Sequence, residues 1–214
     1  TNVVRALQSY SDSVELSKFG GRFKYSKILN VIDDVDRSIT SNITRVIVRR
    51  NLRALINQEA QYELCFGNKF HVNPAGFNIK SSGFRIVNEP DIVYLTDIPN
   101  PDKKKGVLSI VKPIEETGEN RVVIKSAGVV DYEKGEVILS TTLITSTVVA
   151  DDVIEIQAFP ESNDVVGLKD LYLEFDVSKS TINMVKDTIS SGEKISGVGF
   201  KVTSSYSNGE LKRG

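Results

Sequence analysis

The chain has 214 residues, and its 27 Lys and Arg against 28 Asp and Glu give a formal net charge of −1. This balance argues against binding nucleic acid through bulk electrostatics, because proteins that bind polyanions concentrate lysine and arginine. A hydrophobic fraction of 40% also argues against disorder, which goes with low hydrophobicity and high net charge. Composition therefore indicates a soluble, folded protein that is rich in strands.

The chain contains one cysteine, Cys65, and one histidine, His71. A single cysteine cannot form an intrachain disulfide, and it cannot build a zinc site by itself. Cysteine is among the residues most often buried, so the pattern favours Cys65 as a small core side chain. A thiol nucleophile that uses His71 as its base stays open, because both residues lie in a stretch that is typical of a hairpin.

A helix is the first element that the sequence predicts. Tyr25, Ile28, Leu29 and Ile32 recur with the spacing of one helical face. Acidic residues follow, and the C-terminus of a helix carries partial negative charge that disfavours them. We therefore expect this helix to end by about Asp34.

Short strands are predicted next. Residues 45–49 and 62–66 are predicted strands, and residues 69–72 would return after the turn signal at residues 67–68. Residues 52–56 fit either a short helical turn or a continued strand. Cys65 and His71 would then lie on the two arms of one hairpin.

Beyond residue 83 the chain is predicted to be nearly all strand as far as about residue 177. The clearest hairpin covers residues 129–139, where Gly135 would adopt a positive φ at the close of the turn. Residues 170–177 alternate between apolar and polar, which predicts a strand with one buried face and one solvent-exposed face. A short helix is predicted at residues 181–190, with Ser180 as its cap. The other expected strands are at residues 92–95, 107–111, 121–125, 141–149 and 153–158.

The run at residues 99–106 combines prolines with three lysines, which favours an exposed loop or linker. It divides the chain into a mixed helix and strand region at residues 1–98 and a β-rich region at residues 107–214. We therefore expect an α+β fold of mostly antiparallel strands, with an amphipathic helix near the N-terminus and a short helix near residues 181–190.

Charged clusters are the remaining candidates for chemistry. Neighbouring carboxylates occur at Asp33/Asp34 and Asp151/Asp152. Neighbours in a strand point to opposite faces and neighbours in a helix diverge, so both pairs are interpreted as solvated turns. The lysines at residues 103–105 and the arginines Arg45, Arg49, Arg50 and Arg53 are interpreted as solvated surface. We assign no catalytic, cofactor-binding or metal-ligating residue, and we expect no cofactor.

One block of sequence resembles a known family. Residues 15–27 read Glu-Leu-Ser-Lys-Phe-Gly-Gly-Arg-Phe-Lys-Tyr-Ser-Lys, and Asp-Arg-Ser-Ile-Thr-Ser-Asn-Ile-Thr follows at residues 36–44. This block resembles the baseplate wedge subunit of contractile-tailed bacteriophages, a family related to the baseplate J proteins. Further matching pieces lie at residues 62–68, 75–84, 130–135 and 163–171.

The resemblance implies a structural virion protein of the tail baseplate, and not an enzyme. Proteins of this family form dimers that assemble with the other wedge proteins into a ring around the tail hub, and the ring stays continuous while the baseplate changes shape. The implied partners are a second copy of the chain and other wedge proteins, with no nucleic acid and no membrane. Assembly would take place in the host cytoplasm. Because family members are longer, we expect this chain to be a C-terminal portion.

Two other functions are weighed against this one. A ligand-binding β module of the carbohydrate type is the alternative, although an aromatic content of 7% without tryptophan argues against it. A hydrolase would use Cys65 with His71 or one of the carboxylate pairs, and the separation of those side chains decides that hypothesis.

Overall fold

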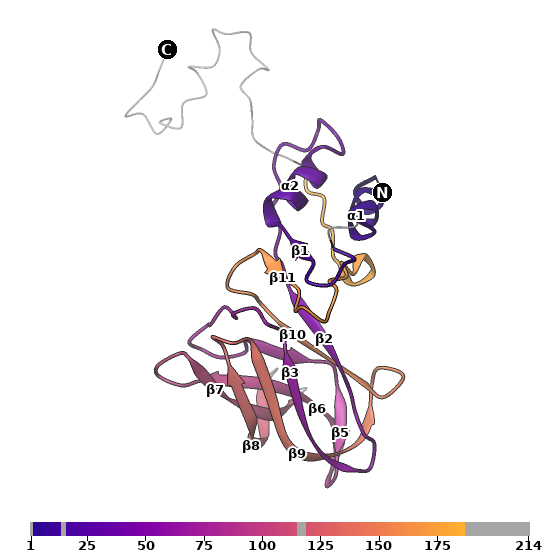
Figure 1. Ribbon diagram of the computed structural model, residues 1–214. Coiled ribbons are helices and arrows are strands. Elements are labelled where there is room, and N and C mark those ends of the chain that lie inside the picture. Colours follow the sequence, from indigo (N-terminus) through magenta and orange to yellow (C-terminus); the bar gives the residue numbers. More distant parts are fainter. Residues whose placement is uncertain (1, 14–15, 115–118, 187–214) are drawn as a thin grey trace, which may run out of the picture. The chain divides into compact units, whose positions relative to one another are not determined.

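The computed structural model describes residues 2–13, 16–114 and 119–186 (Figure 1). The chain divides into two compact units, Thr1–Ser178 and Lys179–Gly214. The first unit holds two hydrophobic cores, a small one around the helices and a larger one in the β-sheets. Strands outnumber helices and pair in antiparallel fashion, which confirms the predicted α+β class.

Two helices and a two-stranded sheet form the smaller core. Helix α1 covers Asn2–Ser11 and α2 covers Tyr25–Asp33, while β1 (Arg22–Phe23) pairs with β11 (Val165–Val166). The segments are far apart in sequence, yet their apolar side chains share one core. Its buried members are Val3, Leu7, Tyr10, Leu16, Phe23, Ile28 and Val165.

The helix predicted from Tyr25 onward is confirmed. At its C-terminus the backbone N–H of Asp34 donates to the carbonyl of Asn30 at 2.9 Å, and the helix ends there as expected. Helix α1 was not predicted. Its signal was present, since Val3, Leu7 and Tyr10 are buried at helical spacing.

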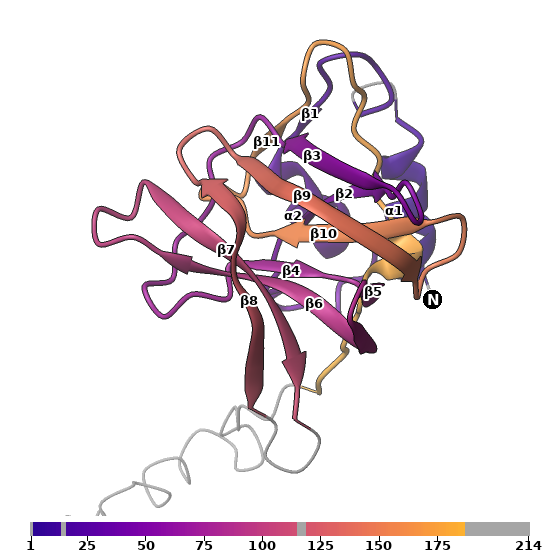
Figure 2. The same ribbon diagram turned by 90° about the horizontal axis from the view of Figure 1, so that it is seen from below.

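Five antiparallel strands close into a barrel, which Figure 2 shows from below. The sheet order runs β5, β6, β7, β8 and β9, and β9 pairs again with β5 to close the ring. A sixth strand, β3 (Glu59–Cys65), adds to the outside edge of β9. The barrel strands are β5 (Phe84–Ile86), β6 (Glu89–Pro99), β7 (Lys105–Pro113), β8 (Asn120–Asp131) and β9 (Glu136–Thr147).

A three-stranded sheet covers part of the barrel core. Strand β10 (Val153–Ala158) lies in its middle, between β2 (Val48–Arg53) and β4 (Ile79–Ser81). Its inward side chains Ile154 and Ile156 are fully buried and belong to the same core cluster as the barrel side chains. The two sheets therefore share one apolar core.

The predicted hairpin at residues 129–139 is confirmed as the β8–β9 hairpin. Gly135 has a φ of +69°, and a Cβ there would overlap the carbonyl oxygen of Asn68. The loop expected at residues 99–106 joins β6 to β7, and Pro99 pairs with Gly106. Both sides of that loop belong to the same barrel, whereas the boundary between the compact units falls after Ser178.

Two predicted strands were wrong. Residues 69–72 form no return strand, since Phe70 makes an isolated bridge to Pro160. Residues 170–177 are not a paired strand, although Leu173, Phe175 and Val177 do pack on the smaller core. Apolar and polar residues alternate in this segment because it is extended and turns every second side chain toward the smaller core.

The predicted helix at residues 181–190 was also wrong where the structure describes it. A single 3-10 turn, η1 (Val177–Lys179), precedes it. Residues 181–186 are exposed and not helical, so the helical spacing of Ile182 and Val185 does not correspond to a buried face among the described residues. Residues 187–190 lie outside the described residues.

A buried carboxylate joins the barrel to the segment before β4. Asp97 on β6 is 1% exposed, and it accepts hydrogen bonds from the backbone N–H of Ile79 at 2.6 Å and the side-chain amide of Asn78 at 2.8 Å. The hydroxyl of Tyr132, at the start of the β8–β9 turn, also donates to it. Burial raises the pKa of Tyr132 above its ordinary value, and the Asp97 carboxylate raises it further.

Replacing Gly135 by alanine should destabilise the protein more than replacing Gly20. Both glycines have positive φ, which costs an L-residue about 1–2 kcal/mol, but only at Gly135 would the new Cβ meet a backbone atom. We expect Gly135→Ala to lose stability beyond that conformational cost, and Gly20→Ala to lose no more than the cost itself. Chemical denaturation measures both, and equal losses would contradict the assigned clash.

Tyr132 should make the fold sensitive to alkali. Because its pKa is raised in the folded state, the unfolded chain loses this proton first, so stability holds below pH about 10 and falls as the pH rises above it. Tyr132→Phe should remove this part of the alkaline loss. It should also cost about 1–3 kcal/mol at neutral pH, because Asp97 loses a donor. Unfolding curves from neutral pH to about one unit above pH 10 test both effects. An unchanged alkaline slope would count against the assignment.

Candidate functional site

The structure does not bring Cys65 and His71 into one site. Cys65 ends β3 and lies opposite Glu136 on β9, so the strand pairs with β9 and not with the segment that carries His71. His71 is exposed, and its backbone N–H donates to the carbonyl of Phe159 at 2.8 Å. The hydrogen bond of the Cys65 thiol goes to Glu63, at 3.7 Å. The predicted hairpin was therefore wrong. Without it, the strand pairing does not place the Cys65 thiol opposite the His71 imidazole, as a thiol–imidazole pair would need.

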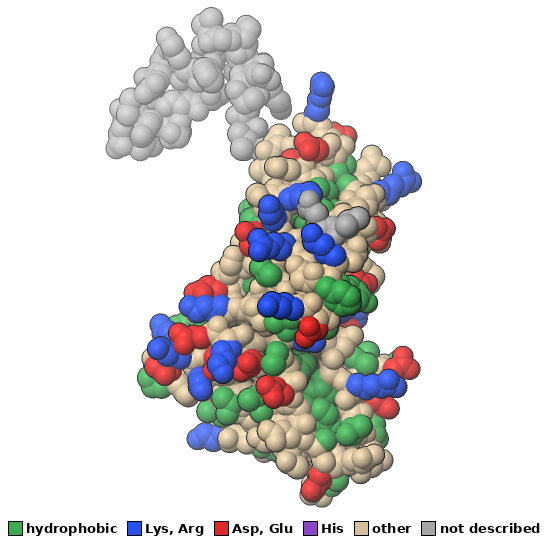
Figure 3. Space-filling model, viewed as in Figure 1, with side chains coloured by type: hydrophobic (Ala, Val, Ile, Leu, Met, Phe, Trp, Pro, Cys, Tyr) green, Lys and Arg blue, Asp and Glu red, His purple; other side chains and the backbone are tan. Residues whose placement is uncertain are grey.

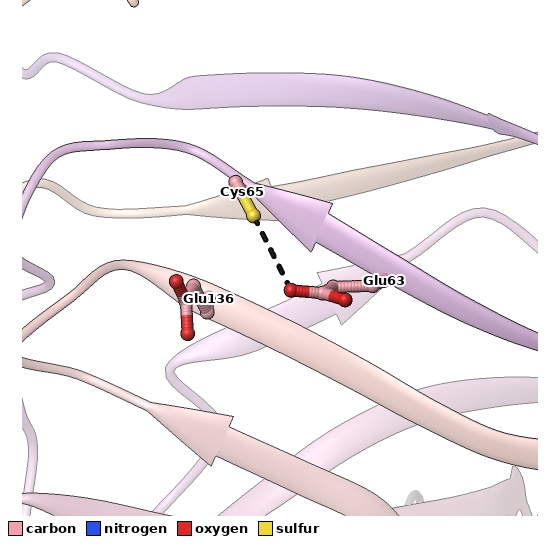
Figure 4. Close-up of side chains that lie close together, drawn as sticks. All are labelled: Glu63, Cys65 and Glu136. Carbon is pink, nitrogen blue, oxygen red and sulfur yellow. Dashed lines mark hydrogen bonds between the residues drawn. The ribbon is translucent and has the colours of Figure 1, made fainter.

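Two carboxylates and the thiol gather instead on the outer face of β3 and β9 (Figure 4). Glu63 and Cys65 are two positions apart on β3, so they share a face, and the register places Glu136 beside Cys65. Their ligand atoms all lie within 4.8 Å of one another. The alternation of Glu63 and Cys65 was visible in the sequence, whereas Glu136 joins them only through the long-range pairing of β3 with β9.

The electrostatics of this cluster keep the thiol protonated. Burial raises the pKa of Cys65, the negative charges of Glu136 and Glu63 raise it further, and Arg50 lowers it in part. A protonated thiol is a poor nucleophile and a poor metal ligand. Thiolate and carboxylate together suit a divalent cation such as zinc, but a metal would first have to displace a proton that these surroundings retain.

A groove of about 490 Å³ lies beside this cluster, between β2 and β3. It is lined by Arg50, Asn51, Leu52 and Arg53 of β2 and by residues 61–65 of β3. The guanidinium of Arg50 donates a hydrogen bond across the groove to the carbonyl of Cys65. Near the turn that joins the strands, the hydroxyl of Tyr62 accepts from the backbone N–H of Leu55 at 3.0 Å.

Asp151 and Asp152 lie in a turn, as predicted, whereas Asp33 is the last residue of α2 and only Asp34 lies in the turn that follows. At the end of α2, Asp33 accepts a hydrogen bond from the side chain of Asn42 at 2.5 Å. Asp151 and Asp152 both have positive φ in the turn that leads into β10, and the carbonyl of Asp152 accepts from the N–H of Ala54. Neither pair converges with another carboxylate to hold a metal within the described ranges.

Some of the basic side chains form ion pairs or contact an aromatic ring, and others are exposed to solvent. Arg49 bridges Glu155 at 3.2 Å and Asp176 at 2.5 Å, and the guanidinium of Arg45 lies 6.0 Å from the ring centre of Phe159. The lysines at residues 103–105 are exposed. Lys103 and Lys104 lie in the β6–β7 loop, and Lys105 begins β7, where its Nζ lies 3.6 Å from a carboxylate oxygen of Asp131. Positive and negative side chains are interspersed on the face that Figure 3 shows, so this face carries no broad patch of one sign.

The N-terminal part of the chain matches a protein family. Residues 1–51 match the family described as baseplate structural protein gp6, C-terminal domain III. The resemblance to a phage baseplate protein is therefore confirmed over this segment. This similarity supports a structural protein of the virion tail baseplate. The matched segment contains α1, β1, α2 and the first residues of β2.

No curated protein matches the chain. Among the residues that the structure describes, no helix is long and apolar enough to cross a bilayer.

The reactivity of Cys65 tests the electrostatics of the cluster. Because its pKa is raised, we expect little thiolate at neutral pH, slow alkylation by iodoacetamide, and a rate that increases only as the pH exceeds the ordinary thiol value of about 8.5. Glu136→Gln removes a negative charge and should lower the pKa and speed alkylation at pH about 8. Glu161→Gln serves as a matched control, because Glu161 pairs with Lys69 and is no part of the cluster. An unchanged rate in Glu136→Gln would show that Glu136 does not raise the pKa of the thiol. An equal acceleration in the control would show that the effect is not specific to Glu136.

Proposed function

We propose that the chain is a subunit of the tail baseplate that binds a second copy of itself and other wedge proteins, as part of a ring around the hub. The observation that carries the proposal is the match of residues 1–51 to a baseplate structural protein. In this proposal the protein is assembled in the host cytoplasm and performs no catalysis. In this proposal the chain belongs to the C-terminal part of a baseplate protein, because the matching model describes a C-terminal domain.

An apolar row on the outside of the barrel supports the proposed contacts. Strand register places one residue from each of β6, β7, β8 and β9 side by side, namely Ile98, Val107, Val129 and Ile138. Ile98 is 54% exposed and Val129 is 45% exposed. The cores of protein–protein interfaces favour apolar side chains and are depleted in charge, so this row suits an assembly contact.

The groove between β2 and β3 gives little support to the carbohydrate alternative. Tyr62 is the one aromatic side chain among the residues that line the groove, and its hydroxyl already bonds the backbone of Leu55. A stacking platform for a sugar ring needs an open aromatic face, and the described lining supplies no second ring beside it.

Self-association can be tested by sedimentation velocity. We expect the wild-type chain to dimerise with increasing concentration, and the double variant Ile98→Glu/Val129→Glu to raise the dissociation constant at least about tenfold, because it places charge in the apolar row. Val148→Glu is the matched control, since Val148 is 56% exposed but lies outside the row. A wild type that stays monomeric at every concentration would count against self-association, and equal effects in both variants would count against the row.

A further inference from the structure

Two strand edges face each other without pairing. Strand β2 pairs on one side with β10, and β3 pairs on one side with β9. Their other edges both line the groove, and no ladder joins β2 to β3 among the pairings of the described strands. Open edges present backbone donors and acceptors that another strand can use.

The hydrogen bonds at the strand ends show which backbone groups are open. The N–H of Ala54 donates to Asp152 at 2.7 Å on the β10 side, and the N–H of Phe66 donates to Gly135 at 2.8 Å on the β9 side. Successive residues of an antiparallel ladder alternate in direction. The backbone groups of Asn51 and Arg53 on β2, and of Glu63 on β3, therefore point into the groove.

A side chain lies between the two strand edges. Strands in a sheet lie about 4.8 Å apart, which leaves no room for a guanidinium between them. The guanidinium of Arg50 occupies the space between β2 and β3 and bonds the carbonyl of Cys65, so the edges are further apart than a directly paired ladder. Arg50 satisfies one acceptor of the β3 edge and leaves the N–H of Glu63 facing the groove.

The charge of the lining indicates what kind of segment would enter. Two arginines, Arg50 and Arg53, line the groove against one carboxylate, Glu63. Neither arginine takes part in an ion pair with the described residues. A strand that displaced Arg50 from Cys65 would leave its guanidinium in need of an acceptor, which a carboxylate on the strand supplies.

We propose that the groove accepts an extended, acidic segment of a partner polypeptide. The segment adds as a strand between β2 and β3, bonds the open backbone groups of Asn51, Arg53 and Glu63, and pairs a carboxylate with Arg50 or Arg53. The inference goes beyond the proposed baseplate role, because it names one surface and the chemistry of its occupant. Isolated protein suffices to test it, so its outcome is separate from that of self-association.

A synthetic peptide of alternating valine and glutamate, about eight residues long, is the probe. We expect it to shift the backbone amide NMR signals of Asn51 and Glu63, and to bind at least about tenfold more tightly than two matched peptides. In one, N-methylation of alternate amides removes the donors, and in the other lysine replaces glutamate. Absence of binding, or shifts confined to other parts of the chain, would overturn the proposal. Equal affinity for the N-methylated peptide would overturn strand addition, and equal affinity for the lysine peptide would overturn the preference for acidic segments.

Variants at Glu63 provide a second test. Glu63→Pro removes the N–H that faces the groove without removing a bond to β9, whereas Glu63→Ala removes the same charge and keeps the donor. We expect Glu63→Pro to weaken binding at least about tenfold relative to Glu63→Ala. Equal binding by the two variants would overturn the proposal. If Glu63→Pro does not fold, the N-methylated peptide on wild-type protein decides the question.

Discussion

A buried carboxylate holds the main elements of the β-structure in one arrangement. Asp97 lies inside the barrel, forms no ion pair with any described residue, and is satisfied by donors from Asn78, Ile79 and Tyr132. A buried charge is tolerated only where hydrogen bonds replace its hydration. Strand β6, the β8–β9 hairpin and the start of β4 must therefore be in place together, which makes closure of the barrel and docking of the second sheet interdependent.

The matched segment and the compact units have different boundaries. Residues 1–51 contain both helices, but the core that those helices build also needs Val165, Leu173 and Phe175 from the far side of the barrel sequence. The ring of Phe175 stacks on Phe23 at 6.2 Å, and the hydroxyl of Ser11 donates to the carbonyl of Phe175. The segment that matches the family model thus completes its core with side chains from outside the match.

Local patterns predicted local structure well. The spacing from Tyr25 onward predicted α2, the turn glycine Gly135 predicted the β8–β9 hairpin, and alternation predicted β10 at residues 153–158. The failures concern partners that are distant in sequence. Residues 170–177 alternate like a strand but lie on a helical core, and Cys65 faces Glu136 because β3 pairs with a strand that follows most of the barrel in the chain. The groove could not be predicted, since it exists only where two strands with different partners run beside each other.

The extended segment at residues 170–177, which crosses the smaller core, also determines which part of the first unit would resist a pulling force on the chain. Chain entering at α1 and leaving near Val177 is joined by the β1–β11 pairing and by the contacts of Phe175, so a pull on those two points acts first on this core. The barrel lies on the loop between them and carries force only after the smaller core has opened. Under tension between those two points, the smaller core would therefore open before the barrel does.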